Sequence, residues 1–165
     1  MIKPKPLKPD LGEESVWDYP RPPTVELANK SIQIYFAGVK IADTHRAWRV
    51  LETSHPPVYY LPPADIRMGS LTPAGGGSWC EWKGQANYYN IEFEDQSAKR
   101  AAWTYSRPTP SFRVIKDHIA FYAWAMDRCL VDGELVRPQP GTFYGGWITK
   151  EIIGPFKGEP GSAGW

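Results

Sequence analysis

The chain has 165 residues with 19 Lys and Arg against 18 Asp and Glu, so its formal net charge is +1. A domain of this length buries roughly 70% of the surface that its unfolded chain exposes, so it needs neither a disulfide nor a metal to fold. The balanced charge gives no electrostatic reason to expect binding to nucleic acid or to an anionic membrane.

The two cysteines and the N-terminal residues indicate where the protein works. Cys80 and Cys129 lie far apart and form no C-x-x-C pair, a usage typical of reduced thiols in the cytoplasm. The first residues carry charge and proline without the apolar core of a signal peptide, and no apolar run reaches membrane-spanning length. The sequence therefore predicts a soluble cytoplasmic protein with no membrane partner, no metal and no cofactor.

Proline and glycine are frequent enough to leave little room for long helices. The 17 Pro and 15 Gly interrupt the chain, while eight Trp and nine Tyr favour strands. The sequence therefore predicts an all-β (mainly β) fold with short helical turns. We expect residues 1–23 to form a Pro-rich extended arm, residues 24–158 a single domain and residues 159–165 a C-terminal tail.

Alternating apolar and polar residues predict strands after the arm. Ile32, Ile34 and Phe36 alternate with polar positions and are followed by a turn and residues 39–41, which indicates a hairpin. The glycine-rich residues 74–78 are expected to form a flexible loop. The other predicted strands cover residues 47–52, 58–61, 79–84, 89–93 and, after a turn at 94–97, a partner around 101–103.

Residues 112–130 admit two interpretations. Apolar residues such as Phe112, Ile115 and Ile119 fall three and four positions apart, as in an amphipathic helix. The same residues also permit a strand, a turn and a strand over residues 118–131. The Asp132-Gly133 pair that follows is a strong hairpin signal, yet the pattern alone leaves both interpretations open.

A break at two prolines gathers the residues most suited to chemistry. His55 precedes Pro56 and has Glu52 three residues before it and Ser54 beside it. A carboxylate can orient an imidazole for proton transfer, so His55 and Glu52 are candidate catalytic residues. They face opposite sides of a regular strand, however, so a pair requires the turn to fold back. The alternative is that His55 and Ser54 bind backbone groups freed at the break.

Cys80 is a less favoured candidate nucleophile. Lys83 would activate its thiol if the two side chains met, but on a regular strand they point to opposite faces. We therefore expect Cys80 and Cys129 to be buried and inert. The cysteines and the three histidines are too scattered in the sequence to predict a metal site.

Aromatic residues with charged neighbours predict a ligand pocket. Trp and Tyr rings can close around a planar or cationic ligand, with charged side chains at the rim. The alternatives are core packing for the rings and cross-strand ion pairing for the charges. The candidate ligand-binding residues are Arg49, Glu52, His55, Tyr60, Trp82, Lys83 and Trp147.

Several motifs together resemble the domain of unknown function 427 family, in the longer single-domain form known from cyanobacteria. They are ESVWDYPRPP at 14–23, RVLETSHPPVYYLP at 49–62, CEWKG at 80–84, VDGE at 131–134, PQPG at 138–141 and FYGGWIT at 143–149. The resemblance implies a β-tent fold, in which two small antiparallel sheets pack at an angle, as in methionine sulfoxide reductase B and the thalidomide-binding domain of cereblon. It thereby favours strand, turn and strand over residues 118–131.

The resemblance also bears on function. Some relatives of this fold bind small ligands in an aromatic cage, which fits the Tyr and Trp content here. Others hold a structural zinc on two C-x-x-C knuckles, which this chain lacks. The family carries a historical nucleotidyltransferase label, but this sequence has no Gly-Ser with paired aspartates to hold the two metals of that reaction.

Three functions follow as hypotheses. The first is binding of a small polar or aromatic molecule in an aromatic-lined pocket. The second is an enzyme of unassigned class in which His55 or Glu52 moves a proton. The third is an adaptor or assembly protein that docks a protein partner through its Pro-rich arm.

Overall fold

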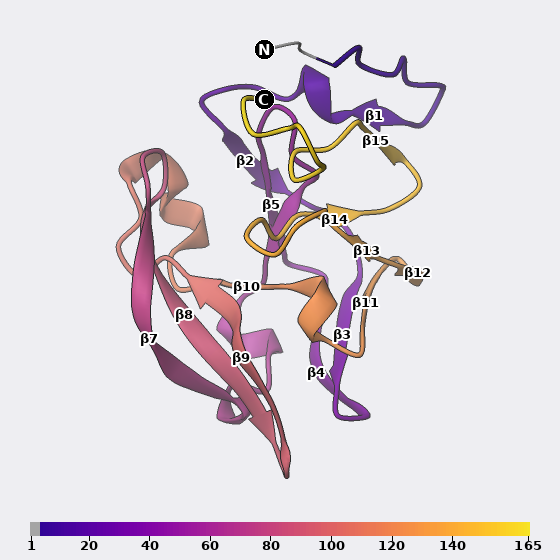
Figure 1. The fold of residues 1–165 in the computed structure, drawn as a ribbon. Helices are drawn as coiled ribbons and strands as arrows, with labels where there is room; N and C mark the ends of the chain where they lie inside the picture. The colour runs from indigo at the N-terminus through magenta and orange to yellow at the C-terminus, as the bar shows by residue number, and fades with distance from the viewer. Residues whose placement is uncertain (1–3) are drawn as a thin grey trace.

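A computed structural model of the chain describes residues 4–165, so the first three residues of the predicted arm lie outside the described part. Within it, strands joined by short 3-10 helices make up the fold (Figure 1). The predicted all-β class is confirmed. None of the helices in this part of the chain has the length and apolar character that crossing a membrane requires.

The first large sheet is built around the predicted hairpin. Its strands, in spatial order, are β12 (Glu134–Leu135), β11 (Arg128–Val131), β3 (Ile32–Phe36) and β4 (Val39–Thr44). Strands β3 and β4 pair antiparallel across a tight turn in which Ala37 and Gly38 both have positive φ. Ile32, Ile34 and Phe36 are buried while the residues between them are half-buried. The alternation seen in the sequence therefore places one face of β3 in the core.

The second large sheet contains a segment that the sequence suggested would be a loop. Its strands are β10 (Ile119–Phe121), β9 (Gln96–Thr104), β8 (Gly84–Phe93) and β7 (Leu71–Cys80). The predicted loop at residues 74–78 is wrong, because these residues belong to β7. The register shifts between Pro73 and Gly77, and a Cβ on Gly77 would lie only 2.6 Å from the Ala86 carbonyl oxygen. The glycine thus allows a close strand contact rather than a flexible link.

The two large sheets lean against each other at an angle, with the main core between them (Figure 1). Residues 118–131 form β10, the 3-10 helix η5 (Ala123–Ala125) and β11, so the strand, turn and strand interpretation is confirmed. Asp132 and Gly133 have positive φ in the turn that follows, as the hairpin signal predicted. Leu61 bridges to Ile119 and so ties the double-proline region to the second sheet.

A smaller sheet carries the two strands that flank the double-proline break. It consists of β2 (Thr24–Leu27), β5 (Trp48–Leu51) and β6 (Val58–Tyr60). The other paired strands are β1 (Glu14–Ser15) with β15 (Ile152–Ile153), and β13 (Arg137–Pro138) with β14 (Trp147–Ile148). The other 3-10 helices are η1 (Val16–Asp18), η2 (Pro63–Asp65), η3 (Met68–Ser70) and η4 (Pro110–Ile115).

The later part of the predicted arm packs onto the domain. Strand β1 pairs in parallel with β15, and Val16 is fully buried. The Trp17 indole donates a hydrogen bond to the Pro155 carbonyl oxygen at 2.9 Å, and its ring meets Trp165 with centroids 5.6 Å apart. Arm and tail therefore contact each other, whereas Leu11, earlier in the arm, is fully exposed.

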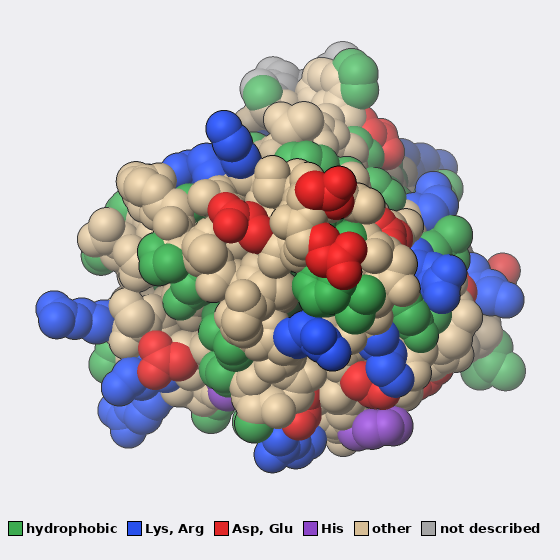
Figure 2. All heavy atoms as spheres, turned by 90° about the horizontal axis from the view of Figure 1, so that it is seen from below, with side chains coloured by type: hydrophobic (Ala, Val, Ile, Leu, Met, Phe, Trp, Pro, Cys, Tyr) green, Lys and Arg blue, Asp and Glu red, His purple; other side chains and the backbone are tan. Residues whose placement is uncertain are grey.

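Charged side chains of both signs are interspersed on the face shown in Figure 2.

One partly buried group of charges joins the arm to the smaller sheet. The Arg49 guanidinium binds the carboxylates of Glu14 and Glu26, and the Tyr19 hydroxyl donates to Glu14 at 2.7 Å. Burial would raise the pKa of Glu14, but the hydrogen bonds from Arg49 and Tyr19 outweigh it and lower that pKa.

We predict that Arg49→Met lowers the free energy of unfolding by about 1–2 kcal/mol, less than for a fully buried pair because solvent screens Glu14. The pKa of Glu14 is lowered in the folded state, so its contribution is complete above its ordinary pKa and is lost on acidification. Urea denaturation of both proteins should show their difference shrinking as the pH falls below that ordinary value. A difference that is constant with pH would contradict the assignment to Glu14.

Candidate functional site

A cavity of about 610 Å³ lies where several parts of the chain meet, and Trp103, Tyr105 and Tyr122 line it between three walls. Its volume is within the roughly 300–1,000 Å³ range of small-molecule sites. The first wall comes from β5, β6 and the turn between them, and the second from the β7–β8 hairpin. The third wall comes from C-terminal residues that include Gln139, Tyr144 and Lys157. These segments are distant in the sequence, so only the folded chain forms the cavity.

Aromatic rings form much of the cavity lining, and their polar edges are held by neighbours. The ring of Trp103 packs on Tyr122 with centroids 4.7 Å apart, and its indole donates to the Tyr60 hydroxyl at 3.4 Å. The Tyr122 hydroxyl donates to the Phe143 carbonyl oxygen at 2.7 Å. Aromatic residues that line the cavity include Tyr60, Trp82, Tyr88, Trp103, Tyr122 and Tyr144. Such rings offer flat surfaces for stacking.

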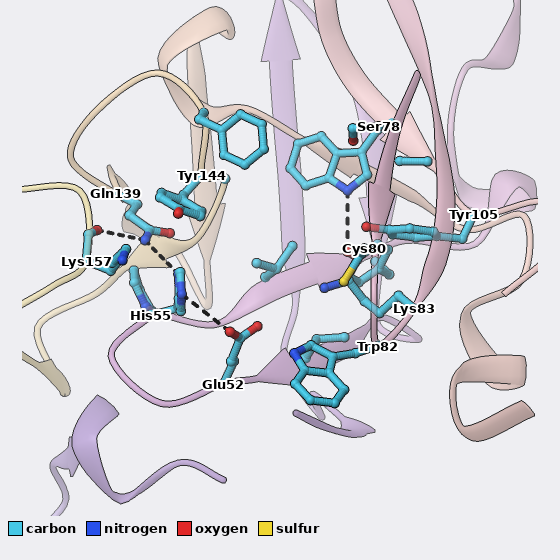
Figure 3. Close-up of a pocket in the computed structure, with 18 of the residues that line it drawn as sticks. Glu52, His55, Ser78, Cys80, Trp82, Lys83, Tyr105, Gln139, Tyr144 and Lys157 are labelled. Atoms are coloured by element: carbon cyan, nitrogen blue, oxygen red, sulfur yellow. Dashed lines mark hydrogen bonds and ion pairs between the residues drawn. The ribbon is translucent and has the colours of Figure 1, made fainter. Parts of the chain in front are cut away.

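Lys83 faces the cavity from the turn between β7 and β8. The expectation that it points away from Cys80 is wrong, because β7 ends at Cys80 and the turn brings Lys83 back beside it (Figure 3). Cys80 is half-buried and lines the cavity, whereas Cys129 is buried as expected. Burial alone would lower the pKa of Lys83, but Tyr60, Cys80 and Glu52 outweigh it and raise that pKa. Lys83 is therefore a cation at neutral pH.

No carboxylate within residues 4–165 forms an ion pair with Lys83. Its ammonium lies 5.8 Å from the centre of the Tyr105 ring instead. Burial raises the pKa values of Tyr60 and Tyr105, so both phenols remain protonated at neutral pH. Lys83 is thus a half-buried cation in contact with aromatic rings, and Glu52 acts on it from another wall of the cavity without forming an ion pair.

Glu52 and His55 meet because the chain folds back after β5. Ser54 has φ of 73°, and the His55 backbone N–H donates to the Glu52 carbonyl oxygen at 3.0 Å. The turn places His55 Nε2 3.6 Å from Glu52 Oε2. The alternative in which the two side chains at the break bind backbone groups is wrong: His55 bonds to the side chain of Gln139, and Ser54 Oγ has no partner among the described residues.

Gln139 is a site residue that the sequence analysis missed. It is 2% exposed and its amide nitrogen lies 3.1 Å from His55 Nδ1. Burial, together with the cations Arg21, Lys157 and Lys83, lowers the pKa of His55 to about 4. His55 is therefore neutral at neutral pH, and its contact with Glu52 is not an ion pair. A polar residue between two prolines, at Pro138 and Pro140, was the available signal for Gln139.

The structure brings together Glu52, His55, Tyr60, Trp82 and Lys83 of the predicted ligand-binding residues, and also Cys80. Arg49 and Trp147 lie elsewhere. Arg49 belongs to the ion pairs with the arm, and Trp147 is a core residue that is 1% exposed.

Sequence comparison places these strands in a family. The family described as Domain of unknown function (DUF427) matches residues 24–132. The chain belongs to the DUF427 family. A search of curated proteins finds no match. The match to DUF427 includes Glu52, His55 and Lys83, whereas Gln139 and Lys157 lie beyond it.

The cavity of this DUF427 protein offers both binding and proton-transfer groups. Lys83 can bind an anion, the Glu52 carboxylate can accept a hydrogen bond or a proton, and the rings can stack on a planar group. Residues 4–165 contain no cluster of three or more His, Cys, Asp and Glu side chains placed to hold a metal ion.

Proposed function

We propose that the cavity binds a small molecule that combines a planar part with an anionic group, such as a carboxylate or a phosphate. The observation that carries this proposal is the Lys83 ammonium in an aromatic cavity, where no carboxylate of residues 4–165 forms an ion pair with it. A ligand anion would pair with Lys83, while the rings take up the planar part. The free thiols of Cys80 and Cys129 support a cytoplasmic setting.

A second candidate function is an enzyme that transfers a proton within the same cavity. The specific support is the 3.6 Å separation of His55 Nε2 and Glu52 Oε2 on the cavity wall. A carboxylate next to a neutral imidazole can act as a general base. Conversion of a ligand that binds the purified protein, lost in Glu52→Gln while binding persists, would favour this function over binding alone.

The test of the binding function is a thermal-shift experiment with matched probe pairs. Indole is compared with indole-3-propionate, and adenosine with AMP, so that each pair differs by an anionic group and the pairs distinguish carboxylate from phosphate. Selective binding to the folded state raises the melting temperature. We expect the anionic member of at least one pair to give a concentration-dependent rise that its neutral partner lacks. Equal responses within both pairs, or none at all, would refute the proposal.

The variant Lys83→Met tests whether Lys83 binds the anionic group of the ligand. We predict that it abolishes the preference for the anionic probe and slightly lowers the melting temperature of the free protein, because the raised pKa of Lys83 means that the folded protein favours its charged form. Lys99→Met, at an exposed position of β9, is the matched control and should retain the preference. If Lys83→Met also retains it, the anion binds elsewhere.

A further inference from the structure

We propose that Gln139 is a positioning residue that holds His55 with its proton on Nε2, and that Glu52 thereby serves as the acceptor for an N–H or O–H group of the ligand. This inference deepens the proposed function, on which its ligand part rests. The arrangement of the imidazole itself requires no ligand. It follows from three hydrogen bonds that surround one buried amide.

The orientation of the Gln139 amide is determined by two backbone groups. Its Oε1 lies 3.0 Å from the backbone nitrogen of Gly146, and its Nε2 lies 2.8 Å from the carbonyl oxygen of Lys157. A backbone N–H can only donate and a carbonyl can only accept, so exchanging the two amide atoms would break both bonds. The amide nitrogen therefore faces both Lys157 and His55 (Figure 3).

This orientation determines which imidazole nitrogen carries the proton. The second amide hydrogen of Gln139 points to His55 Nδ1 at 3.1 Å, so Nδ1 must accept. A neutral imidazole has one donor and one acceptor, which leaves the proton on Nε2. That nitrogen faces Glu52 Oε2 at 3.6 Å. The Tyr144 ring packs edge-on against the imidazole, with centroids 4.8 Å apart, and restricts its rotation.

The charges around His55 favour the neutral ring. The cations Arg21, Lys157 and Lys83 act on it from three different segments, and the Glu52 carboxylate is the anion that faces it. Among the described residues, the ammonium of Lys157 is itself engaged by the carbonyl oxygens of Ala163 and Trp165. His55 therefore acts as a neutral donor through Nε2 and not as the proton acceptor of the cavity.

Glu52 is left as the open acceptor. Its carboxylate lies 3.6 Å from both Arg21 and His55, too far for a normal hydrogen bond. Its side chain is 22% exposed and lines the cavity. A half-buried carboxylate without a close donor favours a ligand that supplies one. The cavity thus matches a planar molecule with an anion for Lys83 and an N–H or O–H donor for Glu52.

The imidazole arrangement is tested by nitrogen NMR on protein labelled with ¹⁵N-histidine. The chain has three histidines, and His55→Gln identifies the signal of His55. We expect the neutral form with the proton on Nε2 and no titration through neutral pH. If the wild-type spectrum shows the His55 proton on Nδ1, or an ordinary histidine titration, that result is enough to overturn the inference without any variant.

Gln139→Glu tests whether Gln139 causes this arrangement. In its ionised form the carboxylate can only accept, so His55 Nδ1 must then donate to it, and we expect the proton to appear on Nδ1 or the ring to become a cation at neutral pH. The signals of the exposed His45 and of His118 are the internal control and should not change. An unchanged His55 signal in the folded variant would show that Gln139 does not position the ring.

The ligand part is tested with tryptophan and indole-3-propionate, which differ by the amino group. A hydrogen bond to the Glu52 carboxylate predicts about tenfold tighter binding of tryptophan, and Glu52→Gln should remove most of that preference. Binding of both probes with equal affinity would refute the role of Glu52 but not the proposed function. If neither they nor the nucleotide pair bind, the proposed function fails and the ligand part fails with it, while the NMR result stands.

Discussion

Replacing Trp147 with alanine is expected to lower the free energy of unfolding by about 3–5 kcal/mol. The side chain is 1% exposed and its ring packs on Tyr59 with centroids 5.2 Å apart. Its indole nitrogen donates a hydrogen bond, 3.0 Å long, to the carbonyl oxygen of Phe121 in strand β10. The alanine variant would therefore leave both a cavity and a buried carbonyl without its donor. Urea denaturation with both proteins at the same pH measures the difference.

Trp79→Ala is the matched control for this prediction. Trp79 is 73% exposed on β7, so its removal should change stability by no more than about 0.5 kcal/mol. A loss in Trp147→Ala that is no larger than in this control would show that the core between the sheets does not depend on the indole.

The second large effect is a loss of stability in mild acid that depends on His55. Its pKa falls from an ordinary 6.5 to about 4 in the folded protein. Between these two pKa values the unfolded chain binds a proton that the folded protein does not bind. The contribution of His55 to stability is therefore complete above the ordinary pKa. It is lost as the pH falls from 6.5 toward 4, by about 3 kcal/mol in total.

His55→Gln should remove this dependence, because glutamine does not titrate. Denaturation curves measured at a series of pH values should fall more steeply for the wild-type protein than for the variant between pH 6.5 and 4. Below that range both proteins lose the contribution of Glu14 and should run parallel. If stability falls equally steeply with pH in both proteins, the lowered pKa of His55 is contradicted. His118→Gln, at a more exposed histidine, is the control and should resemble the wild type.

Local sequence patterns predicted the elements that local forces determine. The hairpin around Ala37 and Gly38 and the turn at Asp132 and Gly133 follow from alternation and turn chemistry, both of which act over a few residues. The glycine run in β7 was misread because flexibility and close strand contact require the same residue, and only the partner strand distinguishes them. Periodicity alone did not settle residues 118–131, since a helix and two short strands fit the same apolar positions.

The candidate site was predictable to a similar extent. Glu52 and His55 were found because the double proline marks a break in a strand, and their pairing required only a turn. Lys83 reached the cavity through a turn that the sequence analysis read as strand. Arg49 was assigned to the cavity wrongly and Gln139 was missed, because their roles depend on partners far away in the sequence: Glu14 for the first, and Gly146 and Lys157 for the second.

The parallel pairing of β1 with β15 has a consequence for synthesis. The ribosome synthesises the chain from its N-terminus. Glu14 and Ser15 can therefore pair with Ile152 and Ile153 only after those residues have been made. Contacts this far apart form late, because closing a long loop costs entropy before the contact repays it. The third wall of the cavity arrives in the same stretch of chain. The cavity therefore lacks this wall until Lys157 has left the ribosome, and it is completed late in folding.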